Sequence, residues 1–320
     1  MDYANLSADT ASRLKLLIDR IDAAKIPASK LDVSLNIATW NIRDFGKTPR
    51  TDDAILFIAQ ILYQFDLIAI TELRDDVQEL KRVLQRLGPH WKFVMSDWQA
   101  DAGGNWERTA YLYDKRMVAF TGLAAEAQPN RNKIGAEYIS QQSWWRSPYI
   151  ASFQAGSFDF IMVAMHARWG DEAGRIKELQ SFGDWISSRW DDSADKVFDQ
   201  DIIVVGDFNI PKIGDKFYQA LTVNSKLKMP KALESIHDTA VSPGHKRYDQ
   251  ILHRAKGAFS YSGKGGIIDF SSNGLMEALF KGTGIAKNKL TWQLSDHFPL
   301  WVQIKTDNDV ARLDSIIQQG

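Results

Sequence analysis

The segment DIIVVGDFN, residues 201–209, holds the pattern on which the fold of this chain depends. Four β-branched residues follow Asp201, which is typical of a buried β-strand. The run ends at Asp207, and Asn209 lies two residues further on. A carboxylate at the end of a buried strand is costly unless it is paired, hydrogen-bonded or bound to a metal ion. The segment therefore predicts a strand that delivers Asp207 and Asn209 to a polar site.

The same arrangement recurs elsewhere, where apolar runs border polar residues suited to metal or phosphate chemistry. These further positions are Asn41, Glu72, His166, Asp249 and the pair Asp296-His297. A single Asp or Asn after a strand is usually a turn or cap residue. Six such positions in one chain, however, favour a shared site over six separate turns. The isolated histidines do not follow the pattern, and we interpret them as surface or packing residues: His237, His245 and His253.

Apolar runs of strand length alternate with segments of helical periodicity, which predicts a mixed α/β sandwich. The expected strands are 35–42, 66–73, 91–96, 109–114, 117–122, 149–155, 158–167, 201–207, 247–253 and 299–305. The expected helices are 7–25, 52–64, 75–87 and 172–190, and the expected long loops are 125–148 and 256–290. We divide the chain into an N-terminal helical extension (1–30), a main domain (31–306) and a C-terminal tail (307–320).

The composition limits the classes of function. The formal net charge is −1, so a nucleic-acid-binding surface has to be a local patch and not a property of the whole chain. The sequence contains no cysteine, which excludes disulfides and cysteine-bound zinc. It shows neither a signal-peptide pattern at its start nor a run of 18 apolar residues. We therefore expect a cytoplasmic protein without a membrane span.

The residue types at the strand ends fit phosphodiester hydrolysis. This reaction needs a divalent cation, a base for the attacking water and stabilisation of charge on phosphorus. Mg²⁺ prefers oxygen ligands, which these five residues offer: Glu72, Asp207, Asp296, Asn41 and Asn209. His166 and His297 are candidates for the base and the acid, because the ordinary histidine pKa lies near neutrality. Each imidazole then needs a carboxylate partner, and Glu107 and Asp249 are the acids left for that task.

Eight motifs occur in the order found in a known family. They are WNIRDFG (40–46), ITELRD (70–75), WERTAYLYDKRMV (106–118), WRSPY (145–149), MHARWG (165–170), GDFN (206–209), RYDQI (247–251) and LSDHFPLWV (294–302). Together they resemble the endonuclease/exonuclease/phosphatase superfamily over about residues 33–305. Within it they are similar to deoxyribonuclease I. The resemblance implies a four-layer α/β/β/α sandwich of two mixed β-sheets flanked by helices.

The resemblance also implies roles for individual residues. Glu72 becomes the main ligand of Mg²⁺ or Mn²⁺, with Asn41, Asp207 and Asp296 near it. His166 pairs with Glu107, His297 pairs with Asp249, and Asn209 holds the scissile phosphate. Three arginines are expected to contact DNA: Arg43, Arg74 and Arg146. The implied activity is a metal-dependent endonuclease that nicks duplex DNA with little sequence specificity.

Some features depart from deoxyribonuclease I. Its disulfides are absent, and Asn105 stands where an aromatic residue packs on a sugar in that enzyme. A tryptophan-rich segment, Ser143-Trp144-Trp145-Arg146, is added and could contact sugars or bases. Three alternatives stay open on these residues: a phosphomonoesterase or an inositol or lipid phosphodiesterase, an abasic-site repair endonuclease, and a binding module without activity. The last is disfavoured because the full set of polar strand-end residues is present.

Overall fold

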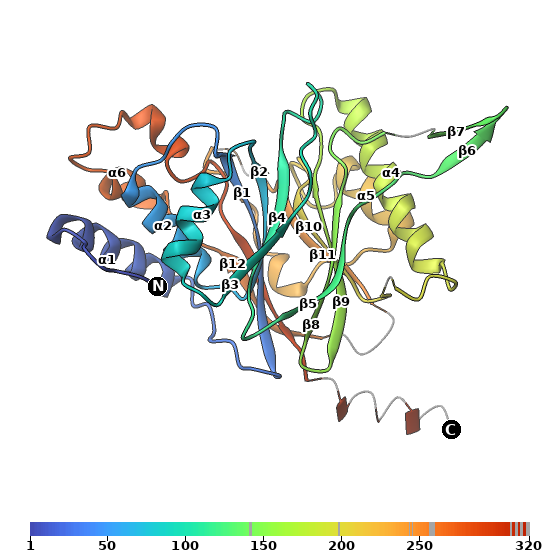
Figure 1. Ribbon diagram of the computed structural model, residues 1–320, viewed down its shortest axis with the longest axis horizontal. Helices are drawn as coiled ribbons and strands as arrows, with labels where there is room; N and C mark the ends of the chain where they lie inside the picture. The colour runs from blue at the N-terminus through green and yellow to red at the C-terminus, as the bar shows by residue number, and fades with distance from the viewer. Residues whose placement is uncertain are drawn as a thin grey trace.

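The computed structural model shows two β-sheets packed face to face, with helices covering the outer face of each sheet (Figure 1). The residues that it describes are 1–140, 143–197, 199–242, 244, 246–255, 260–307, 309–310, 313 and 316–317. The four-layer α/β/β/α sandwich expected from the sequence is thus confirmed. The predicted tail 307–320 falls largely outside the described residues, and the proposed domain boundaries stay predictions.

The first sheet has six strands in the order β12-β13-β1-β2-β4-β3. Their bounds are β1 Ser34–Phe45, β2 Leu67–Leu73, β3 Trp91–Met95, β4 Arg108–Asp114, β12 Ser260–Ile267 and β13 Leu300–Lys305. The central pair β1 and β2 is parallel, and the other pairs are antiparallel. The carboxyl ends of β1 and β2 therefore lie at the same edge of this sheet.

The second sheet has five strands in the order β11-β10-β9-β8-β5. Their bounds are β5 Ala119–Glu126, β8 Tyr149–Ala155, β9 Phe158–His166, β10 Ile202–Asp207 and β11 Asp249–Arg254. Here β9 and β10 are the parallel pair. An apolar core that includes Leu35, Ile37, Phe160 and Met162 fills the space between the two sheets.

The helices form the two outer layers, and several begin where the sequence supplies a capping side chain. Their bounds are α1 Ala8–Ala23, α2 Asp52–Leu62, α3 Gln78–Leu87, α4 Glu172–Asp191, α5 Lys216–Ser225 and α6 Leu275–Leu279. Four of them begin at a side chain that accepts a hydrogen bond from a backbone N–H of the first turn: α1 at Ser7, α2 at Thr51, α4 at Asp171 and α5 at Asp215. The first four helices were expected. In Figure 1, α1, α2, α3 and α6 lie beside the first sheet, while α4 and α5 lie beside the second. Two core clusters fill the space beneath these layers.

Three further 3₁₀ turns lie in the connections: η1 Lys231–Leu233, η2 Ser272–Gly274 and η3 Lys287–Trp292. No helix in the described part of the chain is both long and apolar enough to cross a membrane.

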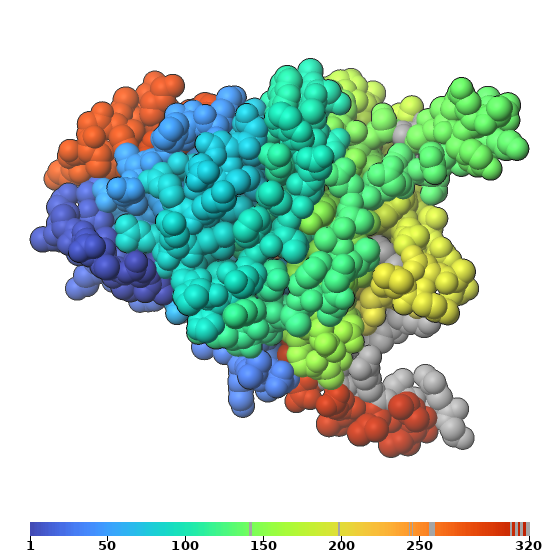
Figure 2. All heavy atoms as spheres, viewed as in Figure 1, coloured from blue at the N-terminus to red at the C-terminus, as the bar shows by residue number. Residues whose placement is uncertain are grey.

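The two long loops expected from the sequence hold more regular structure than predicted. Segment 125–148 contains a hairpin, β6 Arg131–Ile134 with β7 Glu137–Ser140, which stands off the body of the molecule (Figure 2). Segment 256–290 contains β12 and α6, and α5 was not predicted either. The hairpin strands are exposed along most of their length and β12 is rich in glycine, so neither shows the apolar pattern that identifies a strand.

Candidate active site

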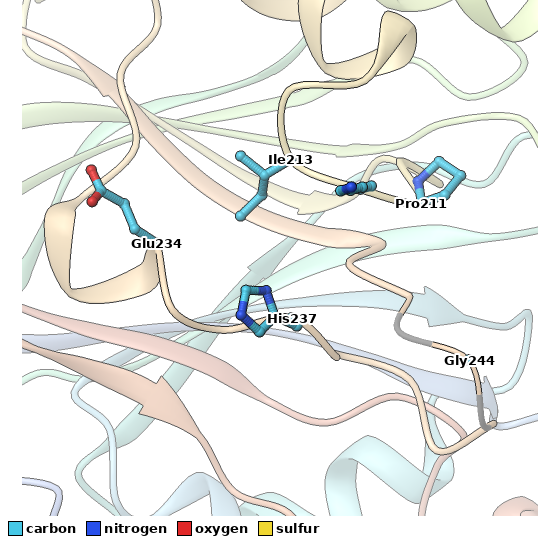
Figure 3. A pocket seen from close by; sticks show the side chains of 6 residues that line it. Pro211, Ile213, Glu234, His237 and Gly244 are labelled. Carbon is cyan, nitrogen blue, oxygen red and sulfur yellow. The ribbon is translucent and has the colours of Figure 1, made fainter.

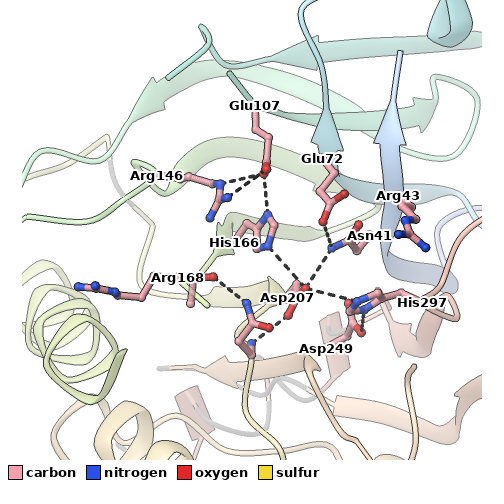
Figure 4. Close-up of polar contacts among 12 residues, drawn as sticks. Asn41, Arg43, Glu72, Glu107, Arg146, His166, Arg168, Asp207, Asp249 and His297 are labelled. Carbon is pink, nitrogen blue, oxygen red and sulfur yellow. Dashed lines mark hydrogen bonds and ion pairs between the residues drawn. The ribbon is translucent and has the colours of Figure 1, made fainter. Parts of the chain in front are cut away.

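Strand pairing places the predicted site residues side by side at one edge of the sandwich. Asp207 at the end of β10 lies opposite His166 on β9 and opposite Asp249 on β11. From the other sheet come Asn41 on β1 and Glu72 on β2. Asn41 Nδ2 donates to Glu72 Oε1 over 2.9 Å and to Asp207 Oδ2 over 3.0 Å, and thereby joins the two sheets (Figure 4).

Local backbone irregularities aim these side chains. The pairing of β2 shifts register on both sides near its end, and Glu72 has a φ of 60° at that point. A bulge of this kind redirects a side chain out of the regular alternation. Gly206, just before Asp207, allows β10 to approach β9 closely, since a Cβ there would lie 2.0 Å from the carbonyl oxygen of Met165. The close approach brings Asp207 beside His166.

The first histidine–carboxylate pair is His166 with Glu107. His166 Nδ1 lies 2.7 Å from Glu107 Oε2. Arg146 holds the same carboxylate, with Nε at 2.8 Å from Oε2 and Nη2 at 3.0 Å from Oε1. Burial alone would raise the pKa of Glu107, but His166 and Arg146 outweigh it and lower this pKa to about 2. Burial and Arg146 act to lower the pKa of His166, yet the net change is upward because Glu107 lies against the ring.

The second pair is His297 with Asp249, where Nδ1 lies 2.8 Å from Oδ2. Burial would lower the pKa of His297, but the carboxylates of Asp249 and Asp207 outweigh it and raise this pKa to about 10. The Nε2 atoms of His166 and His297 lie 3.6 Å and 3.7 Å from the same oxygen, Asp207 Oδ2. Figure 4 shows Asp207 between the two rings. Burial would raise the pKa of Asp207, but His297 and His166 lower it.

Asn209 follows this arrangement in a left-handed backbone conformation, with a φ of 51°. Its backbone N–H donates to Asp207 Oδ1 over 2.9 Å, and its side-chain Nδ2 donates to the carbonyl of Ala167 over 2.8 Å. These two hydrogen bonds fix the orientation of the Asn209 side chain. The structure therefore brings all six predicted catalytic residues together: His166, His297, Asp207, Asn209, Glu107 and Asp249.

The oxygen donors of the site fit a divalent cation. Asn41 Oδ1 is buried and has no hydrogen-bond partner among the described residues. Burial raises the pKa of the nearby Glu72 carboxyl, so a positive charge at this place would stabilise its ionised form. Asp207, Asp249 and His297 also offer ligand atoms within 4.8 Å of one another. Asp296, expected among the metal ligands, is 39% exposed at its side chain and lies 3.5 Å from Arg43 Nη1.

The three arginines expected to reach DNA differ in their surroundings. Arg43 packs its guanidinium 4.0 Å from the ring centroid of Trp292, donates to Thr291 and keeps 29% of its side chain exposed. Arg74 is instead buried, with Nη1 3.0 Å from Asp44 Oδ1. Arg146 is directed at Glu107, as described above. Both arginines pair with carboxylates of the site, Arg74 with Asp44 and Arg146 with Glu107, so their side chains lie inside the site and not on its outer surface.

A cleft of about 350 Å³ opens onto both histidines and onto Glu72, Glu107, Asp207 and Asn209. Four of the residues lining it were not predicted as site residues from the sequence: Asn105, Trp169, Lys246 and Tyr248. Trp169 could have been noticed, because it lies three residues after His166. Two tryptophans were suggested by the sequence as contacts to sugars or bases. Trp144 packs against Phe182 and Trp185, whereas Arg168 Cζ lies 4.2 Å from the ring centroid of Trp145.

A larger hollow of about 640 Å³ lies beyond Pro211 (Figure 3). Its described lining is Pro211, Lys212, Ile213, Glu234, His237 and Gly244. None of the residues that line this hollow belongs to the histidine–carboxylate pairs, so size alone does not make it the reaction site. The smaller cleft is lined by both histidines and by Asp207, and we take it as the candidate active site.

Comparison with known proteins agrees with the family resemblance of the sequence motifs. The family described as Endonuclease/Exonuclease/phosphatase matches residues 38–297. Deoxyribonuclease-1 of Equus caballus is 27% identical over 231 residues, which cover 69% of this chain and 77% of that protein. Deoxyribonuclease-1 of Gallus gallus is 23% identical over 298 residues, covering 91% and 99%.

Among solved structures, a mannosyl-6-phosphatase of Bacteroides thetaiotaomicron superposes with a TM-score of 0.55 and 15% identity, covering 84% of this chain and 99% of that one. At this identity the likeness shows the fold alone. The family match spans most of the chain, and the motifs, the fold and the paired strand-end residues agree with it. The chain therefore belongs to the endonuclease/exonuclease/phosphatase family, is similar to deoxyribonuclease I, and is a hydrolase that acts on phosphate esters.

Proposed function

We propose that this chain is a Mg²⁺- or Mn²⁺-dependent phosphodiesterase that cuts DNA as an endonuclease of low sequence specificity. The observation that carries the proposal is the placement of two histidine–carboxylate pairs on either side of Asp207, with Glu72 and Asn41 adjoining. Such an arrangement supplies an acid and a base around one phosphate. A cytoplasmic location stays a prediction.

In this proposal Glu72 and Asn41 hold the metal ion, with Asp207 and Asp296 near them. When bound, the cation neutralises charge on the phosphate oxygens and supports the attack of water. Asn209 is fixed by Asp207 and Ala167, and the second hydrogen of its side-chain Nδ2 donates to the scissile phosphate. A prearranged set of polar groups of this kind stabilises the charge that builds on phosphorus.

Proton transfer is assigned to the two Nε2 atoms. In each ring Nδ1 is engaged by a carboxylate, which fixes the ring orientation and leaves Nε2 directed at Asp207 and the cleft. One Nε2 accepts a proton from the attacking water, and the other donates a proton to the leaving oxygen. Glu107 and Asp249 position the rings, and Arg146 positions Glu107.

DNA as substrate is supported by Arg43 and by the similarity to deoxyribonuclease-1. Arg43 is held by Trp292 and Thr291 next to Asp296, and part of its guanidinium faces solvent. Planar guanidinium groups match phosphate geometry, and phosphate contacts contribute affinity without reading sequence. The net charge of −1 indicates that few phosphates are contacted.

The proposal is tested by incubating the purified chain with supercoiled plasmid, an abasic duplex, RNA and p-nitrophenyl phosphate, each with Mg²⁺, Mn²⁺ or EDTA. We expect metal-dependent nicking of the plasmid and little release of nitrophenol. Rapid cutting confined to the abasic duplex would identify a repair endonuclease instead. Phosphate release from p-nitrophenyl phosphate or inositol phosphates, with intact nucleic acids, would favour a phosphomonoesterase.

A further inference from the structure

Trp169 is an exposed aromatic residue at the rim of the active-site cleft. It lies in the segment between β9 and α4, three residues after His166, and 56% of its surface is exposed. The residue lines the same cleft as His166, Asp207 and Asn209. An indole usually contributes to stability by being buried. An indole left open beside the reacting groups is better explained by contact with a ligand.

The ring of Trp169 is held in place although it is exposed. It packs edge to face with Tyr248, with ring centroids 5.5 Å apart and an interplanar angle of 82°. Arg175 Cζ lies 5.2 Å from its centroid, and Arg175 itself donates to the carbonyl of Asn209 over 2.9 Å. Tyr248 is followed by Asp249, which orients His297. The indole is therefore positioned by the same residues that support the catalytic groups.

We propose that Trp169 is a platform on which one nucleic-acid base stacks beside the scissile phosphate. The proposal rests on the proposed function and narrows its substrate class. In a continuous duplex both faces of each base are covered by neighbouring bases, so no face is open to a tryptophan. The favoured substrate is then a single strand, or a duplex in which a gap, a mismatch or an extruded nucleotide frees one base.

The surroundings of Trp169 suit a nucleotide. Lys246 lines the same cleft, and its Nζ lies 5.8 Å from the ring centroid of Tyr248. The rim thus offers an indole for a base and an ammonium group for a neighbouring phosphate. Base stacking on an aromatic side chain tolerates every base, which agrees with low sequence specificity. Asn105, also lining the cleft, offers a polar group in place of a second ring.

The test measures kcat/KM on matched 5′-labelled oligonucleotides with wild-type protein and with Trp169→Ala and Trp169→Phe. One set is single-stranded and carries an abasic tetrahydrofuran residue at successive positions around the cut. A further strand has a central tract without any bases. The Ala variant should lose kcat/KM by roughly 5- to 160-fold on the base-bearing strand, the range for loss of one stacked base. The Phe variant should retain most of the activity.

The readout that separates stacking from a structural role is the base-free tract. Wild type and Trp169→Ala should cut it at equal rates, and an abasic residue at the stacking position should slow wild type but not the variant. The advantage of a gapped or mismatched duplex over a fully paired one should also disappear in Trp169→Ala. Tyr63→Ala serves as the control, because Tyr63 is an aromatic residue, 42% exposed, that lies between the end of α2 and the start of β2, whereas Glu72 lies near the far end of that strand.

Two outcomes overturn the proposal, and they are distinguishable. Equal slowing of base-bearing and base-free strands by Trp169→Ala would mean that Trp169 only supports Tyr248, while the nuclease assignment would stand. Cleavage of no nucleic acid by wild type would remove the proposed function and the stacking proposal with it. Melting temperatures of the variants within a few degrees of wild type show that the fold is intact.

Discussion

Arg146 binds Glu107 at two points, with Nε 2.8 Å from Oε2 and Nη2 donating to Oε1 over 3.0 Å. Glu107 in turn lies 2.7 Å from His166 Nδ1. The guanidinium is thus directed away from the outer surface and into the support of a histidine. We expect Arg146→Ala to lower kcat/KM roughly 10- to 100-fold, the usual effect of losing an outer partner of a site residue. The loss should be similar on plasmid DNA and on bis(p-nitrophenyl) phosphate.

Arg146→Lys is the informative companion variant. It keeps the charge but replaces a two-point contact with a single one, so we expect an intermediate loss on both substrates. Impaired DNA cleavage with an unchanged rate on the small diester would instead return Arg146 to the substrate-contacting role that the sequence suggested.

Arg43→Ala, unlike Arg146→Ala, should affect the two substrates differently. Its guanidinium lies against Trp292 with part of its surface open, so it can reach a DNA phosphate that a small diester does not possess. We expect Arg43→Ala to weaken DNA cleavage while sparing the small diester. Loss of one phosphate contact should also reduce the salt dependence of DNA binding. The slope of the logarithm of the association constant against the logarithm of the salt concentration should become shallower by about 1. Arg86→Ala, on the outer helix α3, is the matched control, and a change in its salt slope equal to that of Arg43→Ala would contradict the assignment.

The two histidines should each be essential, and their partners less so. His166→Ala and His297→Ala should reduce kcat on the order of 10²- to 10⁴-fold, as for other general acids and bases. Glu107→Gln and Asp249→Asn retain a hydrogen-bond acceptor for Nδ1 and should cost less. Steady-state kinetics with saturating Mg²⁺ measures both. Wild-type rates in both alanine variants would remove the histidines from the reaction.

Sequence reasoning identified the strands that carry the site because buried strands end abruptly at polar residues. Asp207 and Glu72 follow apolar runs, and this pattern can be recognised in the sequence without knowing which strands lie next to each other in the fold. The direction of Arg74 and Arg146 could not be read in this way. A long flexible side chain turns toward whichever charge is near, and Asp44 and Glu107 approach only once the chain has folded.

Trp169 and the hairpin show two further limits. A tryptophan to which the sequence assigns no role is more often part of the core. Only the folded chain shows that the ring of Trp169 is exposed in the cleft that His166 also lines. The hairpin 131–140 has almost no buried face, so its strands leave no alternation in the sequence. Both features arise from tertiary position and not from local periodicity.

Glu72→Gln should separate metal binding from folding. Burial raises the pKa of Glu72, so a neutral amide should leave the metal-free protein at least as stable as wild type. The variant should lose most of its activity and the increase in melting temperature that Mg²⁺ or Mn²⁺ gives to wild type. Asp66→Asn is the matched control, because Asp66 is also a buried carboxylate but precedes the opposite end of β2. Full wild-type activity in excess EDTA would exclude a required metal.

Asp66 itself should make stability depend on pH. Its Oδ2 accepts hydrogen bonds from Ser29 Oγ and from the backbone N–H of Asn36, but burial outweighs both and raises its pKa from 3.8 to about 6. The folded chain therefore holds this proton more tightly than the unfolded chain. The resulting stabilisation is fully present below about pH 4 and is lost as pH rises through about 6.

The size of this effect follows from the shift, because one pKa unit corresponds to about 1.4 kcal/mol. Between pH 4 and pH 7 the free energy of unfolding of wild type should fall by roughly 2 to 3 kcal/mol more than that of Asp66→Asn. The amide cannot ionise, and its oxygen still accepts from Asn36, so the variant keeps the hydrogen bond while losing the titration. Urea denaturation at pH 4, 5, 6 and 7 measures the difference. Parallel pH profiles for the two proteins would mean that the carboxylate is solvated well enough, or paired closely enough with Arg116, to ionise normally in the folded chain.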